Sequence, residues 1–458
     1  MNKFDMINAK KLQEERVKIY EDILDNKIPK RVPVDISLTL EAVAQFGGLD
    51  LVEAQWKLEK LKEPADKICQ LVYSDICVFA GSFRLPSFYQ ALESRSFIMA
   101  SNGFIQHPEV VGMTVEDYDY LIEKPYDCIL ERVLPRLYKA FNASDPINSA
   151  ISLTKSLLAY QSDYRQLTDI INDLVEKYGF YPSSIFKGGF TETPFDLLAD
   201  QLRGFRGISV DIRRIPDKVK AACEALYPIA FKKGLPKNPS KYSRVFMPLH
   251  MPAFIREEDF AKLYWPTFKR MTYEYASLGI NCSLLCEGDL LRYLDYLYEL
   301  PTNTLLVFES GDPKLIKEKL GKKHIITGLY PIMSLKTKSK KDCVKEVKEY
   351  IDILAPGGKY IFSLDKHPLM LNDINLENLC AVAETVRDYA VYTNPGDTAG
   401  IEFNKEDYTV EPSRELESKY YKTWDQYKAL NPNVSEFGKD KLQWLEEMIF
   451  QYLIYLIL

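Results

Sequence analysis

Seven acidic or histidine side chains each stand at or just after the end of a short apolar run. They are Asp35, Glu192, His250, Glu287, Glu309, Asp365 and His367. Carboxylates and imidazoles bind divalent metals, and they also act as general acids and bases. The chain has only four histidines, and two of them belong to this set. The set therefore predicts a site for a divalent metal or for acid–base chemistry.

Several of these residues also have a purely structural explanation. Asp35 could cap the helix that follows it, because aspartate is a favoured N-cap. Glu192 could lie in a solvated loop, and His250 could be a hydrogen-bonded core histidine. A structural role is harder to find for Glu287 and Glu309, because a carboxylate that points inward at a strand end needs a partner.

The elements that must position these residues form a regular alternation of strands and helices. Eight short apolar runs predict β-strands at residues 31–36, 75–81, 184–190, 245–251, 281–287, 303–309, 323–329 and 359–364. Helical patterns lie between the later runs. Eightfold alternation predicts a parallel (β/α)8 TIM barrel, with reactive groups at the carboxyl ends of its strands. A doubly wound sheet is the alternative, but the chain lacks the G-x-G-x-x-G turn that usually accompanies it.

Two segments do not fit the repeat. Residues 82–183 are expected to form a cap inserted between strands two and three, and Asn102-Gly103 within it predicts a type I′ hairpin. Residues 1–392 would then be the barrel with its cap. Residues 393–458 would be a C-terminal extension packed on the outside. The apolar run 448–458 predicts a packing or oligomer-contact helix, which leaves a homodimer open.

Composition excludes several classes of protein. The 458 residues carry a formal net charge of −6, and the isoelectric point is about 5.6. Neither value favours a nucleic-acid partner. The chain contains no run of 18 consecutive apolar residues, so the sequence predicts no membrane span. Eight irregularly spaced cysteines and a charged N-terminus predict free thiols in a cytoplasmic protein. Of these, Cys282 and Cys286 are expected to pack in the core.

Five stretches of the sequence occur in an order that resembles a known family. They are Pro29-Lys-Arg-Val-Pro-Val34, His107-Pro-Glu-Val-Val-Gly-Met-Thr-Val-Glu-Asp-Tyr118, Gly188-Gly-Phe-Thr-Glu-Thr-Pro-Phe-Asp196 with Leu202-Arg-Gly204, Glu287-Gly-Asp289, and Asp373-Ile-Asn-Leu-Glu-Asn378. The chain thereby resembles the uroporphyrinogen decarboxylase superfamily over roughly residues 28–392, and within it the corrinoid-dependent methyltransferase branch. The decarboxylases carry an Arg-Gln-Ala-Gly-Arg segment that binds substrate carboxylates, and this chain has Asp35-Ile-Ser-Leu-Thr39 instead. Porphyrinogen decarboxylation is therefore not expected.

The resemblance also implies a metal site, with a departure from the family pattern. The methyltransferases have His-x-Cys-Gly after strand five and a distal cysteine after strand eight, where this chain has Leu285-Cys286-Glu287-Gly288 and His367-Pro368. Both replacements are competent ligands, so the resemblance implies zinc shared by Glu287 and His367, completed by Glu309 or His250. Oxygen and nitrogen donors make a harder Lewis acid than thiolates, which suits an ether oxygen.

These implications lead to one expected function and two alternatives. We expect the protein to transfer a methyl group from a small methoxylated molecule to the cobalt of a separate corrinoid protein. A methoxyaromatic compound is the expected substrate. Glu287, Asp35 and Glu192 are the candidate catalytic residues. The alternatives are a metal-free lyase related to the decarboxylases, and a non-catalytic corrinoid-associated protein.

Overall fold

A computed structural model describes residues 3–80, 84–182 and 188–458, and its centre is a parallel sheet of six strands. The strands pair in chain order, and they are β3 (Gly189–Phe190), β4 (Arg244–Leu249), β5 (Asn281–Cys286), β6 (Leu305–Phe308), β7 (Ile325–Tyr330) and β8 (Ser363–Leu364). All five pairings are parallel. The predicted strand at 184–190 is observed only at its end, because its other residues lie mostly outside the described part of the chain. The later predicted strands are confirmed within a few residues.

The first two predicted strands are present as extended segments joined by single parallel bridges. Val34 pairs with Phe362 beside β8, Leu38 pairs with Phe79, and Ile76 pairs with Tyr181. A longer ladder does not form because side chains take its hydrogen bonds. The Val34 amide donates to Asp75 Oδ2 at 2.8 Å, and the Ile36 amide donates to Ser74 Oγ at 3.2 Å.

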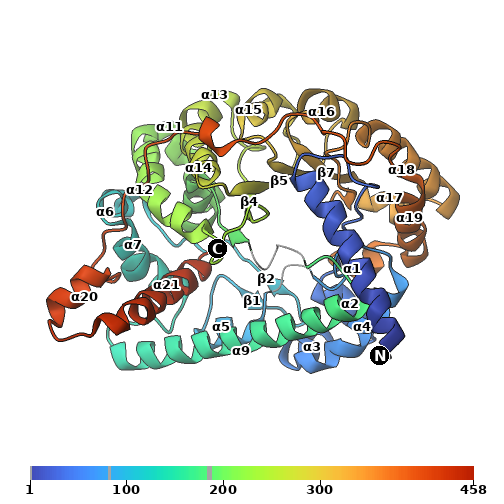
Figure 1. The fold of residues 1–458 in the computed structure, drawn as a ribbon. Helices are drawn as coiled ribbons and strands as arrows, with labels where there is room; N and C mark the ends of the chain where they lie inside the picture. Colours follow the sequence, from blue (N-terminus) through green and yellow to red (C-terminus); the bar gives the residue numbers. More distant parts are fainter. Residues whose placement is uncertain (1–2, 81–83, 183–187) are drawn as a thin grey trace.

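Helices surround the sheet and follow one another along an arc from α11 to α19 (Figure 1). Those along the arc are α11 (Gly204–Arg214), α12 (Pro216–Gly234), α13 (Glu257–Asp259), α14 (Trp265–Ser277), α15 (Leu294–Glu299), α16 (Pro313–Leu320), α17 (Ile332–Thr337), α18 (Lys340–Leu354) and α19 (Leu376–Tyr389). The chain begins with α1 (Lys3–Leu24), followed by α2 (Leu40–Phe46), α3 (Leu51–Trp56) and α4 (Lys62–Leu71). Alternation of parallel strands with covering helices makes this an α/β protein.

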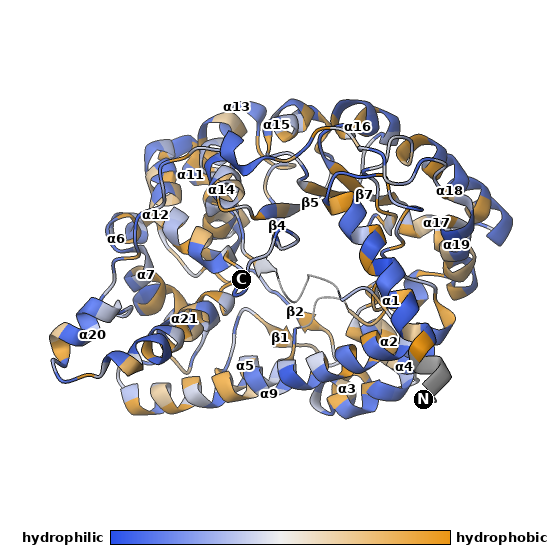
Figure 2. Cartoon of the chain, viewed as in Figure 1, coloured by the Kyte–Doolittle hydropathy of each residue, from blue (hydrophilic) through white to orange (hydrophobic). Residues whose placement is uncertain are grey.

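The region between the second and third predicted strands is largely helical. It contains α5 (Pro86–Ala91), α6 (Tyr118–Glu123), α7 (Pro125–Cys128), α8 (Leu134–Leu137) and α9 (Pro146–Tyr178). The 33-residue α9 alternates between hydrophilic and hydrophobic residues along its length (Figure 2). That pattern lets one side of the helix pack on the body while the other meets solvent.

The predicted hairpin is confirmed, but its turn type is different. Strands β1 (Ile98–Met99) and β2 (Ile105–Gln106) pair antiparallel. A type I′ turn needs positive φ at both central residues, and here only Gly103 has it, at 87°. The Gly103 amide donates to the Ala100 carbonyl oxygen at 2.9 Å, which closes a longer loop with glycine in the left-handed position.

Most of the C-terminal extension is exposed, as expected, but its last residues are buried. It includes α20 (Trp424–Leu430) and α21 (Lys439–Tyr455), and the last residues after α21 are buried. Tyr138 donates to the Leu456 carbonyl oxygen at 2.5 Å, and Tyr452 hydrogen-bonds Ser156 of α9. The apolar run at 448–458 is therefore a packing helix within its own chain. None of the helices in the described ranges has the length and apolarity needed to cross a bilayer.

Candidate functional site

The strands place most of the predicted site residues at their carboxyl ends. His250 directly follows β4, Glu287 follows β5 and Glu309 follows β6. Glu192 stands two residues beyond β3, just before α10 (Pro194–Asp196). Because the strands are parallel and adjacent, these four side chains start from the same edge of the sheet.

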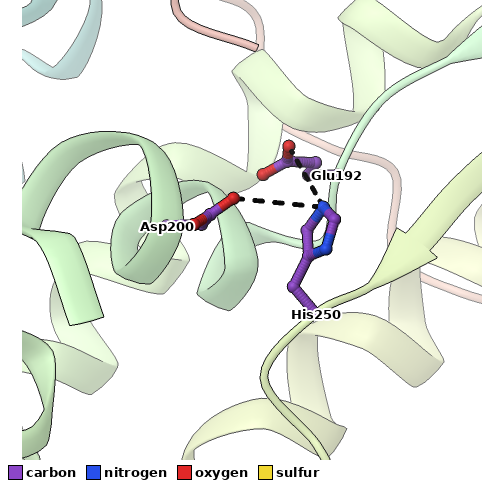
Figure 3. Close-up of side chains that lie close together, drawn as sticks. All are labelled: Glu192, Asp200 and His250. Carbon is purple, nitrogen blue, oxygen red and sulfur yellow. Dashed lines mark ion pairs between the residues drawn. The ribbon is translucent and has the colours of Figure 1, made fainter. Parts of the chain in front are cut away.

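His250 lies at the centre of a group of carboxylates that contact both of its ring nitrogens. Its Nδ1 is 2.8 Å from Glu287 Oε2. Its Nε2 is 3.8 Å from Glu192 Oε1 and 4.0 Å from Asp200 Oδ2. Figure 3 shows that Glu192 and Asp200 approach this same nitrogen from a loop and a helix, while His250 projects from the end of its strand. One side of the imidazole is thus fixed by Glu287, and the other faces two carboxylates.

Asp200 and Gln201, which the pattern of strand ends does not predict, complete this group. Both lie in a π-helical turn, Leu197–Arg203, that follows α10. Gln201 Nε2 donates to Glu192 Oε1 at 2.6 Å and to Asp200 Oδ2 at 3.2 Å. In the sequence, these two polar residues interrupt the apolar run from Leu197 to Leu202, and this interruption could have indicated a site. Neither residue stands at a strand end, so the strand-end pattern does not include them.

The electrostatics of the group follow from burial and from close opposite charges. Burial raises the pKa of the Glu192 carboxyl to about 8, although the nearby His250 opposes the shift. Burial alone would lower the pKa of His250, but the Glu287 hydrogen bond and the Glu192 and Asp196 carboxylates raise it to about 10. Both shifts favour retention of a proton within this group at neutral pH.

Asp196 supports the loop that carries His250. It is fully buried, and it accepts hydrogen bonds from the Met251 amide at 2.9 Å, from Thr193 Oγ1 at 2.9 Å and from Tyr264 Oη at 2.5 Å. These contacts join α10, the residue after His250 and the helix region of Tyr264. Asp196 thus holds the residue after His250 in place and adds a negative charge near the site.

The other predicted site residues lie at the same end of the sheet, but their side chains contact other partners. Glu309 Oε2 accepts from the Gly288 amide at 3.0 Å and is 3.5 Å from Lys366 Nζ. His367 Nδ1 is 3.4 Å from Ser37 Oγ, and burial lowers its pKa. Asp365 Oδ1 accepts from the Ile332 amide at 2.9 Å. Among the described residues, no hydrogen bond or ion pair joins His367 to Glu287, Glu309 or His250.

The donors around His250 Nε2 fit a divalent metal. Glu192, Asp200 and His250 each offer a ligand atom, and these three atoms all lie within 4.8 Å of one another. Within the described ranges, no other group of three histidine, cysteine or acidic side chains meets this condition. Glu192 Oε2 is buried and has no hydrogen-bond partner, so this donor atom remains available. Two carboxylates and an imidazole match the oxygen and nitrogen donors that zinc accepts. A histidine ligand whose other nitrogen is held by a carboxylate is a recurrent feature of such sites.

The neighbouring thiol does not join this group. As expected, Cys282 and Cys286 are both buried in the core, and Cys286 Sγ lies near the Leu284 carbonyl oxygen. Burial raises the pKa of Cys286 far above its usual value. Because the thiolate is the form that binds metals, this neutral thiol is a poor ligand.

A cavity of about 220 Å³ adjoins the group and shares Asp200 and Gln201 with it. Apolar and aromatic residues line most of the remainder, namely Phe97, Val110, Leu137, Phe205, Leu456 and Ile457. The His107 ring stacks on Phe97 in the same cavity, with ring centroids 4.4 Å apart. The C-terminal extension therefore forms part of the wall, and the cavity is lined by both polar and apolar side chains.

Asp35 lies apart from the His250 group and yields a stability prediction. Burial, and then the negative charge of Asp75, raise the pKa of the Asp35 carboxyl to about 7. The folded state therefore holds a proton that the unfolded chain releases near pH 4, so this carboxyl destabilises the fold as the pH rises from about 4 to about 7. We expect Asp35→Asn to gain stability relative to the wild type as the pH rises from about 4 to about 7, by up to about 1.4 kcal/mol for each pH unit. A difference in thermal midpoint between the two proteins that stays constant across this pH range would show that the pKa of the carboxyl is not raised.

Comparison with known proteins gives a likeness in fold. No family model matches the sequence. No curated protein matches it either. Among solved structures, a methyltransferase from Methanosarcina mazei matches with a TM-score of 0.52 and 13% sequence identity, over 81% of this chain and 98% of that one. At this identity the match establishes a shared fold, and it spans nearly the whole of the other protein.

Proposed function

We propose that this protein is a methyltransferase that moves a methyl group from a small methoxylated molecule to the cobalt of a separate corrinoid protein. The observation on which the proposal rests is the His250 group, where two carboxylates face a carboxylate-held imidazole beside a cavity that is partly lined by apolar and aromatic side chains. The methyltransferase that shares the fold supports the reaction class. The corrinoid partner and the methoxyaromatic substrate follow from the sequence resemblance.

The residues of this chain would bind, orient and shield the substrate. Glu192, Asp200 and His250 would hold a divalent metal, most simply zinc, which supplies a Lewis acid for the ether oxygen that leaves. The aromatic wall of the cavity, including Phe97 and Phe205, would bind the apolar part of the substrate. In the overall reaction the bond between oxygen and methyl breaks, the methyl group passes to the partner's cobalt, and the oxygen takes up a proton.

Glu287 is assigned a positioning role for His250, and this assignment predicts a defined loss. Glu287→Gln removes the charge that fixes the imidazole, and loss of such a partner costs about 10- to 100-fold in metal affinity. We expect methyl transfer to be abolished at limiting zinc, with the thermal midpoint nearly unchanged because Glu287 is partly exposed. Zinc affinity is measured by competition with a chelator. Glu309→Gln is the matched control, and equal affinities in both variants would contradict the assignment.

A metal-free lyase is the second candidate, and one observation favours it. Burial raises the pKa of Glu192, and neighbouring carboxylates raise the pKa of His250, so without metal this pair retains a proton at neutral pH. Such a pair could donate a proton to a substrate carbanion. Full activity of the verified metal-free protein would favour this candidate over methyl transfer assisted by a metal.

We also infer that the sheet closes into an eight-stranded barrel. The bridges from Val34 to Phe362, from Leu38 to Phe79 and from Ile76 to Tyr181 support this inference, because they run in parallel from β8 through the first two predicted strands to the segment before β3. Closure would gather the strand-end residues around one mouth, where a barrel enzyme has its active site. His367, Glu309 and Asp35 would then line or underlie that mouth.

Methyl transfer is tested by mixing the purified protein, a methoxyaromatic compound and a reduced corrinoid protein. We expect the absorption spectrum of methylated cobalt to form only when all three are present. Formation at the same rate without this protein would overturn the proposal. The uroporphyrinogen decarboxylase reaction is a useful companion assay, and we expect no coproporphyrinogen from it.

A further inference from the structure

A second cavity, of about 390 Å³, lies at the end of the sheet opposite to His250. Arg31 lines it, three residues before Val34, which pairs with Phe362 beside β8. Tyr73 also lines it, two residues before Asp75. These residues precede their strands, whereas His250 follows β4. The volume falls within the range of small-molecule sites.

Two buried guanidinium groups in the wall of this cavity share a single carboxylate. Arg16 Nε is 3.2 Å from Asp75 Oδ1, and Arg31 Nη1 is 2.7 Å from Asp75 Oδ2. Arg16 and Arg31 are only 6% and 7% exposed, and Asp75 is fully buried. One positive charge therefore remains without a balancing charge in a poorly solvated place, which is costly unless an anion accompanies it.

Both arginines also retain unused donors. Arg16 Nη1 donates to the carbonyl oxygens of Tyr178 and Gly179, while Arg31 Nη2 donates to Tyr73 and Asp75. In the described part of the chain, neither Arg16 Nη2 nor Arg31 Nε has a hydrogen-bond acceptor. The planar fork of a guanidinium group matches the oxygens of a carboxylate or a phosphate.

The rim of the cavity adds balanced charges and apolar surface. Lys30 lies 3.4 Å from Glu15, and Arg387 pairs with Asp388 at 2.7 Å, so the excess charge stays with the buried pair. Arg387 also lies over the Tyr73 ring, 4.8 Å from its centroid. Leu12 and Val391 complete the lining. A bare inorganic anion would leave this apolar surface uncovered.

We propose that this cavity binds a small organic oxyanion, a carboxylate or a phosphate monoester. The anionic end contacts Arg16 and Arg31, and its apolar part contacts Leu12, Tyr73 and Val391. Lys30 and Arg387 offer further hydrogen-bond donors at the rim. The site is separate from the His250 group and does not depend on the proposed methyl transfer.

Calorimetric titration of the full chain tests this with phenyl phosphate, benzoate and inorganic phosphate as probes, at constant ionic strength. We expect saturable binding of phenyl phosphate or benzoate, and the arm that binds identifies the anion class. Inorganic phosphate should bind at least about tenfold more weakly than phenyl phosphate, a factor worth about 1.4 kcal/mol. No saturable binding of either organic probe would overturn the proposal, and so would equal affinity for the two phosphates if phenyl phosphate is the probe that binds.

The double variant Lys30→Gln/Arg387→Gln locates the site without disturbing the buried arginines. We expect it to bind the organic probe about tenfold more weakly. The double variant Lys341→Gln/Lys345→Gln, which removes two charges from the exposed surface of α18, should bind normally. Amide hydrogen exchange provides an independent measurement, because the ligand should slow exchange in α1 and at the end of α19. Unchanged affinity in the double variant, or protection confined to other regions, would contradict the assignment.

Discussion

His250→Ala is expected to lose its bound metal and to slow methyl transfer by about 10³-fold. The substitution removes the imidazole between Glu192 and Asp200, and two carboxylates alone form a weak site for zinc. A Lewis acid contributes several kcal/mol to stabilising the leaving oxygen, and each 1.36 kcal/mol corresponds to tenfold in rate. Metal content by elemental analysis and the rate of methyl-cobalt formation measure the two effects.

His367→Ala is the matched control, because it removes a second imidazole from the same end of the sheet. The geometry favours retention of the metal in this variant, since His367 contacts Ser37 and not the His250 group. The sequence resemblance instead implies that His367 is a ligand together with Glu287. Loss of metal in His367→Ala with retention in His250→Ala would reject the site built on Glu192, Asp200 and His250.

Asp75→Asn is expected to destabilise the whole protein by about 3–5 kcal/mol, the usual cost of breaking a buried ion pair by removing one partner. Burial alone would raise the pKa of Asp75, but its hydrogen bond with Arg31 keeps that pKa below the usual value. The carboxylate also accepts the Val34 amide, so its loss weakens the start of the first extended segment.

The thermal midpoint measures this loss, and Asp295→Asn is the control. Asp295 pairs with Lys319 on the surface, where its side chain is 84% exposed. A surface ion pair contributes at most about 1 kcal/mol, so the control should melt almost like the wild type. Equal midpoints for the two variants would show that the buried arginines do not need Asp75.

The positions of His250, Glu287 and Glu309 could be predicted from the sequence because strand periodicity fixes where each parallel strand ends. The hydrogen bond between His250 and Glu287 could not be predicted, since it depends on the directions of two side chains. Asp200 was missed because it lies in a π-helical turn, at no strand end. Its approach to Glu192 depends on a local distortion that propensity does not reveal.

For the fold as well, features set by neighbouring residues could be predicted, whereas contacts between distant segments could not. Apolar runs located the later strands, and Asn102-Gly103 located the hairpin, because both signals are local. The contacts of Leu456 and Ile457 with the cavity beside Asp200 join segments more than 250 residues apart in the chain. No local pattern specifies such a contact, and the run at 448–458 indicated only a packing or oligomer-contact helix. The side-chain hydrogen bonds that shorten the first strand likewise depend on tertiary neighbours.

X-ray absorption at the zinc edge of the zinc-loaded protein tests the central claim most directly. The site built on Glu192, Asp200 and His250 predicts one zinc per chain, with oxygen and nitrogen neighbours at about 2.0–2.2 Å and no sulfur at about 2.3 Å. The signal should disappear from His250→Ala and persist in His367→Ala. A sulfur neighbour, or an unchanged signal in His250→Ala, would contradict this account.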